Sequence, residues 1–77
     1  MKTLYLQGIG SKPAVRAAEL EGGDVTMWNY GFTETILGIS KETAKTIVFN
    51  IKCNDSGFIT TRRLAKDRLV VRLDRQI

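Results

Sequence analysis

The segment TTRRLAKDR, residues 60–68, places four basic side chains within seven positions, directly after two threonine hydroxyls. The four basic residues are Arg62, Arg63, Lys66 and Arg68. Guanidinium forks beside small hydroxyl groups are suited to binding phosphate oxygens. Adjacent strand residues point to opposite faces, so Arg62 and Arg63 share one ligand only if the strand bends or bulges. The alternative is a solvated surface on which an arginine pairs with Asp67 or Glu34.

The distribution of charge along the chain also indicates that this segment is a candidate binding site. The net charge is +4, and six basic residues balance six acidic ones through residue 56. From residue 57 onward, six more basic residues stand against only Asp67 and Asp74. A basic segment of this kind favours nucleic acid, a nucleotide or an acidic protein surface as partner. An edge strand kept soluble by its charges would explain the pattern equally well.

A second candidate site is aromatic and lies in the stretch DVTMWNYG, residues 24–31. In an extended strand Val25 and Met27 point to one face, and Trp28 and Tyr30 point to the other. We expect Val25 and Met27 to face the core. Trp28 and Tyr30 then form a partly exposed platform near the turn, suited to base stacking or to insertion into a partner. Because strands of small barrels bend and twist, the alternative is that Trp28 caps the core.

The residues needed for catalysis are scarce. The chain has no histidine, and therefore lacks the commonest general base and the commonest metal ligand. The one cysteine, Cys53, has no histidine to activate it, and we expect it to be a buried structural thiol. The segment GIGSKP, residues 8–13, does not have the spacing of a phosphate-binding loop, and Pro13 stands where a helix would have to begin. We therefore predict a protein that is not an enzyme and has no metal site and no cofactor.

Length and cysteine content predict the number of domains and the cellular compartment. Seventy-seven residues form one domain, near the lower limit of what a hydrophobic core stabilises alone, so a homo-oligomer is an open possibility. A single cysteine cannot form an internal disulfide, which is typical of a reducing compartment. The first residues, MKTLYLQGIGSKP, have an apolar run too short for a signal peptide or a membrane span. We expect a cytoplasmic protein that has no membrane partner.

Short β-rich runs separated by Gly, Asn, Asp and Ser predict an all-β fold. The runs expected to be strands are 3–7, 25–29, 33–39, 46–53, 58–64 and 69–73. Residues 8–13 read as a flexible connector, 14–20 as either helix or strand, and 65–68 as a helical turn.

Alternation within the runs predicts which side chains share a face. In the strongest strand Ile47, Phe49, Ile51 and Cys53 point inward. In the last strand Leu69, Val71 and Leu73 do so, and in the run 33–39 Thr35, Leu37 and Ile39 lie on one side.

Five or six short strands joined in sequence, with one helical turn before the last, resemble an SH3-like small β-barrel. We expect one domain over residues 1–77, in which 1–13 form an N-terminal strand or flexible arm and 14–73 form the barrel. The sequence pattern ELEGGDVTMWNYG…TILGI…RLAKDRLV is also similar to that of short uncharacterised proteins of bacteriophages and prophages. That resemblance implies a phage-like setting, in which small β proteins often bind and block a host component.

These observations predict a non-catalytic binding module. Its partner would be nucleic acid or a nucleotide, held by an aromatic and arginine-rich surface of Trp28, Tyr30, Arg62, Arg63, Lys66 and Arg68. The alternative is a phage-type inhibitor that docks on a host protein through the same surface. A third class, a structural subunit of a larger particle, predicts self-assembly that depends on concentration.

Overall fold

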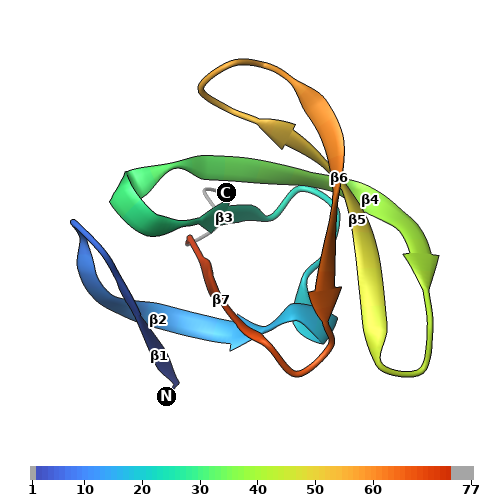
Figure 1. Cartoon of the computed structure of the whole chain (residues 1–77), viewed down its shortest axis with the longest axis horizontal. Helices are drawn as coiled ribbons and strands as arrows, with labels where there is room; N and C mark the ends of the chain where they lie inside the picture. Colours follow the sequence, from blue (N-terminus) through green and yellow to red (C-terminus); the bar gives the residue numbers. More distant parts are fainter. Residues whose placement is uncertain (1, 74–77) are drawn as a thin grey trace.

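A computed structural model describes residues 2–73 and shows a single antiparallel sheet of seven strands, which confirms the all-β prediction (Figure 1). Asp74 and Arg75, which enter the charge count, lie outside the described residues. The strands are β1 (Thr3–Leu6), β2 (Gly10–Arg16), β3 (Val25–Met27), β4 (Thr33–Glu42), β5 (Thr46–Cys53), β6 (Ile59–Ala65) and β7 (Leu69–Arg72). Two short 3₁₀ turns, η1 (Ala17–Glu19) and η2 (Asn29–Gly31), follow β2 and β3.

The order of the strands forces the sheet to curl. The order is β1-β2-β7-β3-β4-β5-β6, so β6 is an edge strand and β7 lies between β2 and β3. Only residues 66–68 separate β6 from β7 in the sequence. Because so short a connection cannot cross a flat sheet, the β6 edge must bend back toward β2, as Figure 1 shows. Backbone hydrogen bonds from Ala17 N–H to the Arg68 carbonyl (2.8 Å) and from Ala18 N–H to the Lys66 carbonyl (3.0 Å) fix this approach.

The core lies inside this curl and is centred on β5. Ile47, Phe49 and Ile51 are 3%, 0% and 1% exposed, as their alternation predicts, whereas Cys53 at the end of the strand is only partly buried. The other buried members of the cluster come from four different elements or their ends. They are Ala17, Leu20, Ile36, Leu64 and Val70.

The prediction that residues 8–13 form a flexible connector is wrong for the last four of these residues. Gly10 to Pro13 belong to β2 and pair with β1, from Leu6 opposite Gly10 to Thr3 opposite Pro13. Gly8 has a φ of +77°, which a glycine adopts without strain, and it supplies the tight turn between the two strands. The ambiguous run 14–20 divides, since it finishes β2 and then forms η1.

The number of strands and the turn before β7 also differ from prediction. There are seven strands rather than five or six, because residues 10–16, which read as part of a connector and part of an ambiguous run, form β2. Residues 65–68 form a hydrogen-bonded turn, with Arg68 N–H donating to the Ala65 carbonyl (3.1 Å), and not a helical one.

In β4 and β7 the side chains that face the core differ from those predicted from the sequence. In β7 Val70 belongs to the core cluster, whereas Leu69, which was expected inward, is only partly buried. Val71, also expected inward, is buried and lies opposite buried Ala14 of β2. In β4, Leu37 and Ile39 are 48% and 52% exposed, on a strand whose register with β5 shifts twice.

Within residues 2–73, no helix is long and apolar enough to span a membrane.

Candidate functional site

Trp28 leaves β3 on the side that faces the core, so the prediction that Val25 and Met27 point inward is wrong. Thr26, on the same face as Trp28, is 1% exposed, whereas Val25 and Met27 are only partly buried. The Trp28 ring is partly buried and packs against the core cluster. Apolar–polar alternation predicts the wrong inward face here, because the inward polar residue, Thr26, forms its hydrogen bonds within the protein. Thr26 Oγ1 accepts from Trp28 Nε1 (3.1 Å) and donates to the Glu34 carbonyl (3.4 Å).

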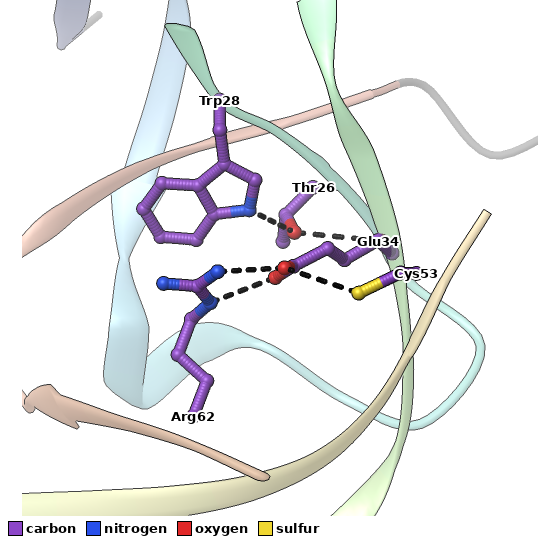
Figure 2. A network of polar contacts seen from close by, with 5 residues as sticks. All are labelled: Thr26, Trp28, Glu34, Cys53 and Arg62. Atoms are coloured by element: carbon purple, nitrogen blue, oxygen red, sulfur yellow. Dashed lines mark hydrogen bonds and ion pairs between the residues drawn. The ribbon is translucent and has the colours of Figure 1, made fainter. Parts of the chain in front are cut away.

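Arg62 lies against the face of the Trp28 ring, with its guanidinium carbon 4.3 Å from the ring centroid (Figure 2). The same guanidinium forms a bidentate pair with the Glu34 carboxylate, from Nε to Oε1 at 2.8 Å and from Nη2 to Oε2 at 2.6 Å. The Glu34 side chain is only 8% exposed, whereas that of Arg62 is 38% exposed. The pairing of an arginine with Glu34, one of the alternatives left open by the sequence, is therefore present.

The Arg62–Glu34 pair is a fixed part of the site. The hydrogen bonds that Arg62 makes with Glu34 raise the pKa of its guanidinium above the ordinary value, although burial acts to lower it. Because the raised group is an arginine, the pair is not weakened by loss of the Arg62 proton at any pH below the ordinary guanidinium pKa. Cys53 completes the network, since its Sγ lies 3.9 Å from Glu34 Oε2.

Arg68 also lies over the Trp28 ring, with its guanidinium carbon 5.6 Å from the centroid. Unlike Arg62 it is exposed, and no carboxylate between residues 2 and 73 pairs with it. Its donors are therefore available to an anion, whereas two of the nitrogens of Arg62 are occupied by Glu34.

Tyr30 is held in an unusual conformation that keeps its ring outside. Its φ of 65° and ψ of 14° are left-handed, which costs a non-glycine residue about 1–2 kcal/mol. The turn between β1 and β2 compensates, because the Tyr30 N–H donates to the Gln7 carbonyl (2.7 Å) and the Tyr30 hydroxyl donates to Gln7 Oε1 (2.8 Å). Tyr30 as a whole is 67% exposed. Strain retained at an exposed aromatic residue is a feature of binding sites.

These side chains surround a surface hollow of about 430 Å³, which we call the aromatic hollow. Of the described residues that line it, four are aromatic, two are arginines and none is acidic. The described residues that line it are Leu4, Tyr5, Leu6, Trp28, Asn29, Tyr30, Phe32, Arg62 and Arg68.

A second hollow of about 410 Å³ adjoins the first, and we call it the acidic hollow. It shares Trp28, Phe32 and Arg62 with the aromatic hollow, but its further lining includes Glu34 and Asp55. Phe32, which is 58% exposed, borders both hollows.

Arg63 and Lys66, the other two predicted site residues, lie elsewhere. Arg63 pairs with Val48 across β5 and β6 on the outer face, while Arg62 pairs with buried Phe49. The strict alternation of β6 thus sends the two arginines to opposite faces. Lys66 forms an ion pair with Glu42, with Nζ 2.6 Å from Oε2. The structure therefore brings together Trp28, Tyr30, Arg62 and Arg68.

Four residues of the site were not expected from the sequence: Tyr5, Phe32, Glu34 as an organising residue, and Asp55. The role of Glu34 could have been predicted, because it lies on the same face of a strand as Ile36. A carboxylate on an inward face requires a cationic partner. Tyr5 gave no such signal, since it comes to the hollow only through the hairpin of β1 and β2.

No protein-family model, no curated protein and no solved structure matches this chain.

Proposed function

We propose that this chain is a non-catalytic binding module whose aromatic hollow holds single-stranded nucleic acid or a nucleotide. One observation carries the proposal: four aromatic residues and two arginines line a single hollow, and none of its described lining residues is acidic. Aromatic faces that stack bases, next to cations that hold the backbone, are the usual means of binding single strands.

The proposed stacking surfaces differ in part from the pair expected from the sequence, Trp28 and Tyr30. Arg62 already lies against the Trp28 ring, so the indole forms the floor of the hollow. Tyr30 and Phe32, which are 67% and 58% exposed, offer open ring faces at its rim. A base has a π-face whatever its identity, so this arrangement suits stacking without strong dependence on sequence.

The cationic part of the proposed site is small. Arg68 has all its donors available, and Arg62 keeps the donors that Glu34 does not use. Two such groups hold one or two phosphates, so the logarithm of the affinity for a single strand should fall against the logarithm of salt with a slope of about −0.7 to −1.4.

The experiment uses Trp28, the only tryptophan of the chain, as its own probe. A short thymine oligonucleotide should change the Trp28 fluorescence on binding, more strongly than a duplex of the same length, and with the shallow salt slope given above. A duplex bound as tightly as the single strand, or no saturable change with either, would contradict the proposal.

A protein partner is the second candidate, and the exposed start of the edge strand β6 favours it. Phe58, directly before β6, and Ile59, its first residue, are 65% and 62% exposed. This candidate corresponds to a phage-type inhibitor of a host protein. It predicts that Phe58→Ser weakens the complex while Arg68→Glu and added salt have little effect, because an interface centred on apolar residues depends weakly on screening.

For the fold we keep the SH3-like barrel as a proposal. It is supported by short antiparallel strands that follow one another in the sequence and by a sheet that curls around one core. In the described chain this sheet stays open, with β1 and β6 as its edges.

A further inference from the structure

The two adjoining hollows differ in charge, although they share one wall. The aromatic hollow contains Arg68 and has no acidic residue in its described lining, whereas the acidic hollow contains Glu34 and Asp55. Glu34 is neutralised by its bidentate pair with Arg62. Asp55 is exposed in the turn between β5 and β6 and has no hydrogen-bond or ion-pair partner among residues 2–73.

This difference orients a nucleotide across the wall. A phosphate is attracted by Arg68 and repelled by Asp55, so it belongs in the aromatic hollow. The base attached to it then reaches past Phe32 into the acidic hollow, where the exposed Phe32 ring supplies a stacking face.

Asp55 selects which base fits there. An ionised carboxylate only accepts hydrogen bonds and has two oxygens to do so. The Watson–Crick edge of guanine presents two neighbouring donors, the N1–H and the N2 amino group, which match both oxygens. Adenine has an acceptor at N1, and thymine has a single N3–H between two carbonyl oxygens, so both leave a carboxylate oxygen facing an acceptor.

We propose that Asp55 makes the site prefer guanine, so that the bound ligand is a guanine nucleotide or a guanine within a single strand. This inference rests on the proposed function. A bidentate pair of this kind discriminates between bases by about fivefold or more.

The experiment compares short thymine oligonucleotides that differ only in their central base: guanine, hypoxanthine, adenine or thymine. Hypoxanthine lacks only the N2 amino group of guanine and so tests the second hydrogen bond directly. The guanine probe should bind the parent protein at least about fivefold more tightly than the thymine and adenine probes, with the hypoxanthine probe in between. Asp55→Ala should reduce these ratios to about one.

Asp67→Ala is the matched control, because Asp67 is an exposed acid in the other turn of β6 and its loss changes the charge equally. It should raise the affinity for all probes alike and leave the ratios unchanged. Equal affinities in the parent, or a guanine preference that survives Asp55→Ala, would overturn the inference while the proposed function stands. If none of the probes binds, both fall.

Discussion

Trp28 is joined to the rest of the molecule by three kinds of contact. Its ring packs on the core cluster, its Nε1–H donates to Thr26, and its face carries the Arg62 guanidinium. A side chain with these contacts supports the fold and the floor of the hollow at the same time. Met27, which points to the opposite face of β3, is outside the core cluster.

This difference predicts opposite costs for two neighbouring truncations. Trp28→Ala should lower the free energy of unfolding by about 3 kcal/mol, at the low end for a tryptophan in a core because the ring is partly exposed. Met27→Ala should cost about 1 kcal/mol, as at an ordinary position. Urea unfolding followed by circular dichroism measures both. Equal costs, or a larger cost for Met27→Ala, would show that the inward face of β3 is misassigned.

Arg62 is unsuited to testing ligand binding by substitution. Its removal leaves the Glu34 carboxylate, whose side chain is 8% exposed, without its cation, and stranding a buried charge is strongly destabilising. A loss of binding in an Arg62 variant would therefore report on stability as well as on the ligand. Arg68 avoids this difficulty because no described acidic residue depends on it.

At the scale of elements, the turn between β1 and β2 positions Tyr30. A Cβ atom on Gly8 would lie 3.1 Å from Tyr30 Cδ1, and the glycine itself has a φ of +77°. The turn thus needs glycine both for its conformation and for the close approach of the tyrosine ring. The Gln7 hydrogen bonds to Tyr30 depend on the same approach.

Gly8→Ala should consequently destabilise the protein by about 1 kcal/mol or more and weaken oligonucleotide binding by displacing the Tyr30 ring. Gly38→Ala is the control, because Gly38 does not have a positive φ and a Cβ there meets nothing within 4 Å. It should leave both properties nearly unchanged. Unfolding midpoints and Trp28 fluorescence titrations measure the two effects. Wild-type affinity in a folded Gly8→Ala variant would remove Tyr30 from the proposed site.

In the middle of the sheet, the local alternation of apolar and polar residues was sufficient to predict which side chains face the core. β5 has a continuous apolar face, so Ile47, Phe49 and Ile51 could be placed in the core from sequence alone. The separation of Arg62 from Arg63 likewise follows from the period of a strand, and β6 has no bulge to break it.

What could not be predicted depends on contacts between distant parts of the chain. Thr26 faces inward because Trp28 and the Glu34 carbonyl satisfy its hydroxyl, and no pattern within β3 contains that information. Val70 is buried in addition to the expected Val71, because β7 inserts between β2 and β3, a placement that only the topology provides. For the same reason the β1–β2 hairpin could not be predicted from a segment that reads as a flexible connector. This hairpin brings Tyr5 to the aromatic hollow and Gln7 to Tyr30.

We propose that an anion is held at the aromatic hollow and not by the diffuse positive charge of the C-terminal third. Charge reversal at Arg68 and at Arg63 separates these, because the two changes alter the net charge equally on different faces of the molecule. The measurement is the affinity for a thymine oligonucleotide at several salt concentrations. Arg68→Glu should lower it about tenfold or more and reduce the salt slope by about one phosphate contact, whereas Arg63→Glu should have a small effect. Equal losses in the two variants, or a larger loss for Arg63→Glu, would contradict an anion site at the aromatic hollow.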